Sequence, residues 1–205
     1  MNILAIGSHP DDLEYGCGGT LLKFAKKRNK IFLLVMTRGE IGGDPKIRIK
    51  EQKKSADFLN AKLFWGHYQD TKIPLSKELI TEIEQIIQMS KPTLIFVHYP
   101  EDTHQDHRVI SQATITATRY IRNVLFYEVP TTVNFTPTVF VDIGPTIKQK
   151  LSLLKIHKSQ VYQTRIAELS ILESANSCAI FRGFQNRVKY AEGFVPLRLA
   201  LDFKL

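Results

Sequence analysis

The sequence has little of several features that would assign it to a special class of protein. Only two of its 205 residues are cysteines, Cys17 and Cys178, which is too few for a disulfide framework. No apolar run approaches the roughly 20 residues that a membrane-spanning helix needs. The N-terminus, MNILAIGSHPDD, has no basic segment before its apolar run, unlike a secretory signal peptide. We therefore expect a cytoplasmic protein with no membrane partner.

Internal repeats and low-complexity segments are also absent, and the length suits a single domain over residues 1–205. The formal net charge of +8 raises the question of nucleic-acid binding. However, the lysines are scattered over several segments, and no aromatic residues interleave with them as in an RNA-stacking motif. We interpret them as solvated helix faces and expect no nucleic-acid partner. The same charge mildly favours an anionic substrate.

Short apolar runs alternate with amphipathic segments over the first 130 residues. This alternation predicts βαβ units, so the expected fold is an α/β, Rossmann-like three-layer sandwich with a mostly parallel central sheet flanked by helices. The expected strands are 2–7, 31–37, 61–65, 93–98 and 124–129, and the expected helices are 18–28, 46–60, 76–89 and 107–121. Beyond Pro130 we expect a strand at 138–143, helices near 145–157 and 165–177, and an edge strand at 188–195.

The first chemically dense segment is His9-Pro10-Asp11-Asp12, directly after the first strand. Ligands of open α/β sheets bind beyond the carboxyl ends of the strands, where this segment falls. Two adjacent carboxylates repel each other unless a cation or a shared proton offsets their charge. Capping of the next helix by the two aspartates explains this segment equally well. The following glycines, at positions 16, 18 and 19, do not fit a dinucleotide-binding motif.

The second dense segment, His104-Gln105-Asp106-His107, follows the strand that ends at His98. Helix capping does not readily explain a His-x-Asp-His set in addition to the first segment. Three protein ligands and an open position are typical of catalytic zinc sites, whereas closed structural sites usually need more cysteines than this chain has. The two segments together predict a catalytic Zn2+ site. His98 is a candidate for a supporting role, and a structural role is equally consistent with the sequence.

With these motifs, the sequence resembles the LmbE-like, or PIG-L, family of zinc-dependent N-deacetylases over nearly its whole length. The segments that carry the resemblance are HPDDLEYGCGGTL at 9–21, MTRGEIGG at 36–43, Arg48 with Glu51, EDTHQDHR at 101–108, VFVDIG at 139–144, KLSLLKIHKSQ at 150–160 and FRGFQNRVKYAEGF at 181–194. Gln105 stands where the family often has proline, and Asn60-Ala61 replaces a usual Leu-Gly junction.

The resemblance implies a set of roles. It implies His9, Asp12 and His107 as zinc ligands and Asp11 as the general base. His104, as an imidazolium, would stabilise the oxyanion or protonate the leaving amine, and Asp106 would orient His104. Arg48 would contact the substrate, because a guanidinium binds carboxylate or phosphate in a bidentate manner. A surface pair between Arg48 and Glu51 is the alternative for that residue.

The implied activity is hydrolysis of the N-acetyl group of an N-acetylated, GlcNAc-type sugar or sugar conjugate. Two alternatives stay open: a related zinc amidase acting on a larger amide conjugate, and a non-catalytic sugar-binding or nucleic-acid-binding protein with a vestigial metal site. Neither the particular sugar nor the oligomeric state can be read from the sequence, although homo-oligomers are common in the family.

Overall fold

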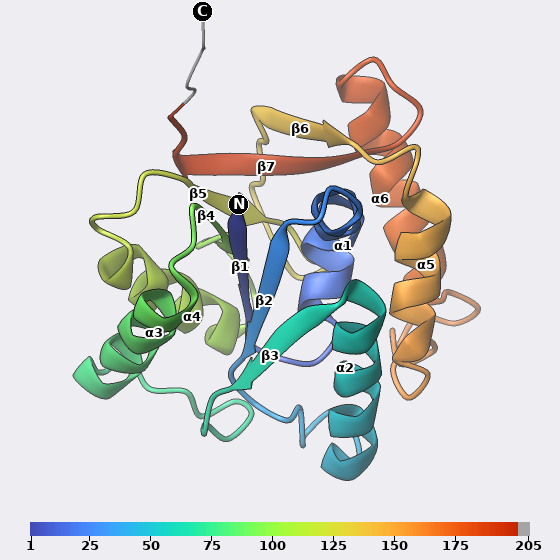
Figure 1. The fold of residues 1–205 in the computed structure, drawn as a ribbon. Helices are drawn as coiled ribbons and strands as arrows, with labels where there is room; N and C mark the ends of the chain where they lie inside the picture. Colours follow the sequence, from blue (N-terminus) through green and yellow to red (C-terminus); the bar gives the residue numbers. More distant parts are fainter. Residues whose placement is uncertain (201–205) are drawn as a thin grey trace, which may run out of the picture.

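The computed structural model describes residues 1–200, which form a central sheet with helices on both of its faces (Figure 1). The strands are β1 (Asn2–Gly7), β2 (Lys30–Val35), β3 (Ala61–Trp65), β4 (Leu94–His98), β5 (Val124–Tyr127), β6 (Val139–Asp142) and β7 (Ala191–Arg198). The helices are α1 (Asp12–Lys26), α2 (Pro45–Leu59), α3 (Lys77–Ser90), α4 (Gln105–Ala117), α5 (Ile147–Ile156) and α6 (Ile171–Gln185).

The strand order is β3-β2-β1-β4-β5-β7-β6, and the first five strands are parallel. Among the strands of residues 1–200, β7 alone runs in the opposite direction to the others, because it pairs antiparallel with both β5 and β6. The expected three-layer α/β class is therefore confirmed. The expected edge position of the last strand is wrong, since β7 lies inside the sheet and β6 forms the edge.

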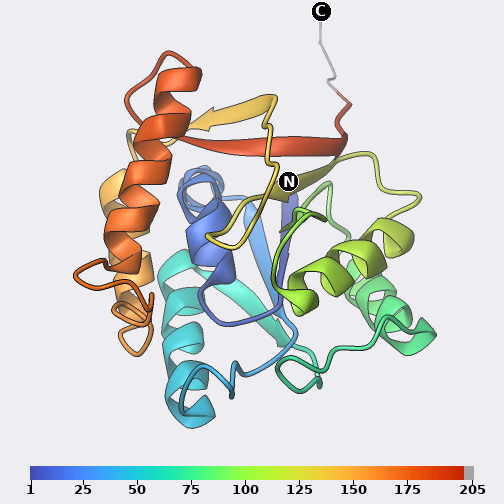
Figure 2. The same ribbon diagram turned by 180° about the vertical axis from the view of Figure 1, so that it is seen from behind.

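Two apolar clusters fill the space on either side of the sheet. Helices α1, α2, α5 and α6 cover one face, and α3 and α4 cover the other, as both views of the ribbon show (Figures 1 and 2). The central strands are buried on both faces, which explains why they are continuous apolar runs. No helix among residues 1–200 is both long and apolar enough to cross a bilayer.

The first helix begins six residues earlier than the sequence indicates, at Asp12 rather than near residue 18. Glycines disfavour helix interiors, which is why the segment around 16–19 does not look helical in the sequence. Gly16 lies directly against the ring of Tyr127 on β5. A Cβ at position 16 would lie 2.1 Å from Cδ2 of that ring, so this position needs glycine. Tertiary packing thus overrides local propensity.

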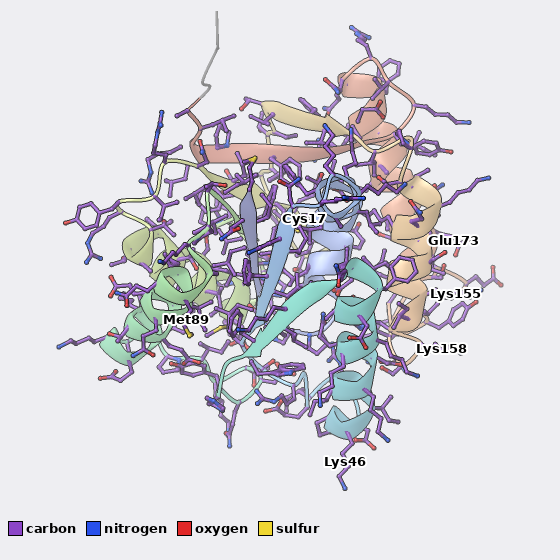
Figure 3. All side chains as sticks on the ribbon, in the orientation of Figure 1. Cys17, Lys46, Met89, Lys155, Lys158 and Glu173 are labelled. Carbon is purple, nitrogen blue, oxygen red and sulfur yellow. The ribbon has the colours of Figure 1, made fainter. Side chains whose placement is uncertain are left out.

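Several of the lysines lie where solvated helix faces were expected. Lys46 projects from the start of α2, and Lys155 and Lys158 project from α5 and the segment after it (Figure 3). All three are exposed, whereas Cys17, also labelled in Figure 3, is buried on α1. The positive charge is therefore carried largely on the outer surface.

Candidate metal centre

The loops after β1 and β4 meet at the carboxyl edge of the sheet because these two strands are parallel neighbours. His9 lies between β1 and α1, and Asp12 is the first residue of α1. His104 and His107 lie at the start of α4, which follows the loop after β4. The fold therefore brings together the two segments that the sequence singled out.

Three of the predicted ligands, His9, Asp12 and His107, form a small triangle, in which Asp12 faces one histidine with each of its carboxylate oxygens. Nδ1 of His9 lies 3.3 Å from Nε2 of His107 and 3.4 Å from Oδ2 of Asp12. Nε2 of His107 lies 3.6 Å from Oδ1 of Asp12. Tetrahedral zinc, with bonds of 2.0–2.2 Å, separates neighbouring ligand atoms by roughly 3.3–3.6 Å. The spacing and the imidazole–carboxylate chemistry of these residues fit a zinc-like divalent cation.

Neighbouring side chains offer further donor atoms. His9 and His107 also form a compact group with His104, and Asp12 and His107 form one with His98. His98 is fully buried, and its ring stacks on His107 with centroids 3.9 Å apart. The site is thus a contiguous histidine–aspartate cluster, and the His9–Asp12–His107 triangle lies within it.

The ring nitrogen of His9 that points away from the triangle, Nε2, contacts two buried carboxylates. Nε2 lies 3.0 Å from Oδ1 of Asp70 and 3.3 Å from Oδ2 of Asp106. Burial alone would lower the pKa of His9, but Asp106, Asp12 and Asp70 outweigh burial and raise that pKa well above its usual value. In a neutral His9 ring, these carboxylates favour the proton on Nε2, so Nδ1 is the nitrogen that would face a cation, and a bound cation would replace the second proton.

The outer nitrogen of His107 is held in the same manner by a different residue. Nδ1 of His107 lies 3.2 Å from Oδ2 of Asp102 and 3.3 Å from Oγ1 of Thr131. Asp102 is itself fixed, because it accepts a hydrogen bond from Thr132 at 3.0 Å and one from the backbone N–H of His104 at 2.8 Å. His107 therefore presents Nε2 to the triangle, whereas His9 presents Nδ1.

Asp12 does not cap the first helix with its side chain. Its Oδ2 turns back to the preceding loop and accepts from the backbone N–H of His9 at 2.7 Å and of Ser8 at 3.1 Å. Burial would raise the pKa of Asp12, but His107 and His98 outweigh it and hold the pKa well below its usual value. The alternative of simple helix capping, which the sequence left open, does not describe this residue.

Asp11 differs from Asp12 in backbone and environment. It precedes α1 with a left-handed backbone (φ 98°) and makes no side-chain capping bond. Its side chain is 24% exposed, against 9% for Asp12, so it is the more open of the two. Burial raises the pKa of Asp11 to about 6, with Arg48 opposing the rise and Asp12 adding to it. A carboxylate of this kind accepts a proton near neutral pH.

The expected relationship between Asp106 and His104 needs correction. The Asp106 carboxylate contacts His9 and the backbone N–H of Thr71, rather than the His104 ring. Nδ1 of His104 instead accepts from the backbone N–H of Asp106 at 3.2 Å, which makes His104 the N-cap of α4. Burial, with the neighbouring His9 and His107, lowers the pKa of His104. Both the lowered pKa and the bond to Nδ1 favour a neutral ring with its proton on Nε2 over the expected imidazolium.

Arg48 also lies differently from the expectation. It is 5% exposed, and its guanidinium donates to the backbone carbonyls of Gly39 at 2.8 Å and Pro10 at 2.7 Å. Its Nη2 lies 3.6 Å from Oδ1 of Asp11. Glu51 does not pair with it, since the Glu51 carboxylate accepts from the backbone and hydroxyl of Ser159. The arginine thus supports the loop of Asp11, a geometry that does not support the predicted substrate contact.

Sequence reasoning missed two supporting carboxylates, Asp70 and Asp102. Asp70 lies in the loop after β3, which carries no motif, and no signal in the sequence connects it with His9. Asp102 lies two residues before His104, within the EDTHQDHR segment at 101–108, and its position there was the available signal. Both are buried, at 5% and 4% exposure, and both hold the outer nitrogen of a predicted ligand.

A three-layer α/β fold with a histidine–aspartate cluster at the carboxyl edge of its parallel strands defines the class of protein. The PIG-L family model, described as GlcNAc-PI de-N-acetylase, matches residues 4–118, which include both clusters. The chain belongs to the PIG-L family.

Relatives and solved structures agree with this placement. The deacetylase YaiS of Escherichia coli, itself uncharacterised, is 36% identical over 171 residues, covering 77% of this chain and 90% of YaiS. Diacetylchitobiose deacetylase of Thermococcus kodakarensis is 28% identical, covering 95% of this chain and 83% of that protein. The crystal structure of the conserved protein TT1542 from Thermus thermophilus has a TM-score of 0.85 at 25% identity, covering 99% of this chain and 97% of that one.

Proposed function

We propose that the protein is a metal-dependent N-deacetylase that hydrolyses the acetamide of an N-acetylglucosamine-type sugar or sugar conjugate, with Zn2+ as the metal. The observation that carries the metal assignment is the triangle of His9, Asp12 and His107, in which the facing nitrogens of the two histidines lie 3.3 Å apart and the nearest Asp12 oxygens lie 3.4 and 3.6 Å from them. Family membership and the diacetylchitobiose deacetylase relative support the substrate class. The substrate partner is thus a small molecule.

The three triangle residues would hold the cation through Nδ1 of His9, a carboxylate oxygen of Asp12 and Nε2 of His107. A zinc ion bound there supplies Lewis acidity, which polarises an amide carbonyl and lowers the pKa of a water molecule to about 7. The protein residues around it supply proton transfer, orientation and charge. Asp70 and Asp106 orient His9, and Asp102 orients His107, so the ring nitrogens that face the cation are fixed in advance.

Asp11 is the proposed general base. It does not belong to the triangle, it is the most open carboxylate of the first segment, and its raised pKa suits proton transfer near pH 7. After the attack, the proton that Asp11 has accepted is available for the departing amine. The products are acetate and the free amino sugar, so one water molecule is consumed for each amide bond broken.

His104 is the proposed donor to the carbonyl oxygen as negative charge develops on it. Its Nδ1 is occupied by the backbone N–H of Asp106, so only Nε2–H remains to donate. The ring lies beside His9, with centroids 4.7 Å apart, and one of its nitrogens lies within 4.8 Å of ring nitrogens of both His9 and His107. A preorganised neutral donor of this kind stabilises an oxyanion without a change in its own protonation.

The test is an assay of the purified protein on a panel of N-acetylated sugars, with free amine and acetate both quantified. N-acetylglucosamine and N,N'-diacetylchitobiose represent the proposed class, and N-acyl derivatives with longer acids represent a larger amide conjugate. We expect equal amounts of amine and acetate, loss of both after chelation, and their return on addition of zinc. Turnover of only the longer acyl groups would favour the alternative amidase, and activity that survives chelation would exclude the metal mechanism.

A further inference from the structure

Two side chains of α2 hold one peptide bond of the loop that carries the proposed base. Nη2 of Arg48 donates to the carbonyl oxygen of Pro10 at 2.7 Å, and the backbone N–H of Asp11 donates to Oε1 of Gln52 at 3.3 Å. This carbonyl and this N–H belong to the same peptide unit. Arg48 and Gln52 are four residues apart on a helix, so both reach the peptide from one face of α2.

The peptide is worth holding because the backbone of Asp11 is strained. Its φ of 98° and ψ of −23° lie outside the regions that most side-chain-bearing residues prefer. A residue in such a conformation costs on the order of 1–3 kcal/mol and persists only where the surroundings enforce it. The Asp11 side chain gives no capping bond of its own, so the bond from its backbone N–H to Gln52 is part of that enforcement.

Gln52 is itself fixed in one orientation. It is fully buried, and its Nε2 donates to Oε1 of Glu14 at 2.8 Å. A carboxylate only accepts hydrogen bonds and a backbone N–H only donates them, so the amide oxygen of Gln52 must face Asp11. Ser55 also donates its hydroxyl to Glu14, and Nε2 of His157 lies 3.5 Å from the same carboxylate. Glu14, itself fixed by these contacts, therefore holds the Gln52 side chain on the side away from Asp11.

We propose that Gln52 is a positioning residue that sets the direction of the Asp11 carboxylate, an inference that rests on the proposed function of Asp11 as the base. His9 and Asp12 lie on either side of the Pro10–Asp11 peptide and both belong to the triangle. A rotation of this peptide would therefore move the Asp11 carboxylate while the two proposed ligands stay in place. A displacement of about 1 Å is enough to cost on the order of 100-fold in rate. The role of Gln52 is therefore in turnover and not in metal binding.

The test replaces Gln52 with methionine, which has nearly the same length but makes no amide hydrogen bonds. We expect Gln52→Met to lower kcat by roughly 10-fold to 100-fold on an N-acetylglucosamine substrate, with KM changed by less than about 3-fold. Zinc affinity, measured by competition with a chromophoric chelator, should stay within about 3-fold of the unaltered protein. Gln85→Met, the same exchange at an exposed position of α3, is the control, because it leaves the contacts of Glu14 and Asp11 unchanged.

A double variant separates positioning from general damage. If Gln52 acts through Asp11, then Asp11→Asn combined with Gln52→Met should be no slower than Asp11→Asn alone. Equal fold-losses in both backgrounds, or a kcat of Gln52→Met within about 2-fold of the unaltered protein, would overturn the proposal. If Gln52→Met fails to fold, Gln52→Asn, which keeps an amide on a shorter side chain, replaces it under the same criteria.

A crystal structure of the Gln52 variant keeps this inference separate from the proposed function. We expect Asp11 to leave the left-handed region once its N–H loses the acceptor. An Asp11 φ that remains near 98° in the variant would contradict the positioning role even if the enzyme were inactive. Conversely, an unaltered protein that releases no acetate from any sugar of the panel would refute the proposed function, whatever the conformation of Asp11.

Discussion

Nε2 of His107 lies 3.3 Å from Nδ1 of His9, so one histidine points its Nε2 atom and the other its Nδ1 atom into the triangle. The difference follows from their supporting carboxylates, because Asp102 holds Nδ1 of His107 whereas Asp70 and Asp106 hold Nε2 of His9. Each carboxylate favours a proton on the nitrogen that it contacts. The geometry of the site therefore depends on residues that do not belong to the triangle.

The first prediction concerns Asp102. Asp102→Asn keeps the size of the side chain but has only one acceptor oxygen for the three donors that now surround it, Thr132, His107 and the His104 backbone. We expect zinc affinity to fall by about 10-fold to 100-fold. Chelator competition measures the effect, and Asp57→Asn on the exposed face of α2 is the control. An affinity within about 2-fold of the control would show that Asp102 does not orient His107.

The second prediction concerns Asp11 and turnover. Asp11→Asn keeps the shape of the side chain but cannot accept a proton as a carboxylate does. We expect kcat to fall by roughly 100-fold to 10,000-fold, the usual contribution of a general base, while bound zinc is retained. Steady-state kinetics and metal analysis of the same preparation give the answer. Normal deacetylation by this variant would rule out Asp11 as the base.

The third prediction concerns the same substitution and stability in chelated, metal-free protein. The pKa of Asp11 is raised from 3.8 to about 6 in the folded state, so its ionisation destabilises the fold. This penalty is absent below the unfolded pKa, grows between pH 4 and pH 6, and is fully present above the folded pKa. Asparagine does not ionise, so Asp11→Asn should raise Tm more at pH 8 than at pH 5, by roughly 2–4 °C for each kcal/mol. A Tm difference that does not change with pH would contradict the shift.

Much of the site could be predicted because its chemistry is concentrated in two short segments. His9 and Asp12 lie where β1 leads into α1, and His107 lies in the first turn of α4. The alternation of strands and helices predicts that both segments reach the same edge of the sheet. The parallel strands were equally readable, since burial on both faces leaves continuous apolar runs. The features that could be predicted are those encoded by residues close together in the sequence.

The remaining features depend on contacts between distant segments. Gln52 supports Asp11 across 41 residues, and Asp70 reaches His9 across 61, so neither contact has a local pattern. The interior position of β7 depends on long-range pairing with β5 and β6 rather than on its own sequence. The role of Arg48 was expected from its charge, but burial directs its donors to backbone carbonyls.

The fourth prediction concerns the buried ion pair between Lys150 and Glu192. Nζ of Lys150 lies 2.6 Å from Oε1 of Glu192, whose carboxylate also accepts from the backbone N–H groups of Gly19 and Thr20. Lys150→Met leaves that carboxylate buried without its counter-charge and should lower the free energy of unfolding by about 3–5 kcal/mol. Urea denaturation measures the loss, and adding Glu192→Gln should recover part of it. A single variant within about 1 kcal/mol of the unaltered protein would contradict this account.

The last prediction compares two glycines of α1. A Cβ at Gly16 would lie 2.1 Å from Cδ2 of Tyr127, whose ring is fully buried and whose hydroxyl donates to the carbonyl of Ile6 at 2.9 Å. The ring cannot yield without loss of that bond, so Gly16→Ala should destabilise the protein by about 1–3 kcal/mol or more. At Gly18 the nearest atom is Cδ2 of Leu153 at 3.3 Å, and alanine gains up to about 1 kcal/mol in helix propensity. Gly18→Ala should therefore change the free energy of unfolding by less than about 1 kcal/mol. Equal effects of the two substitutions in urea denaturation would mean that glycine at position 16 serves the helix backbone and not the contact with β5.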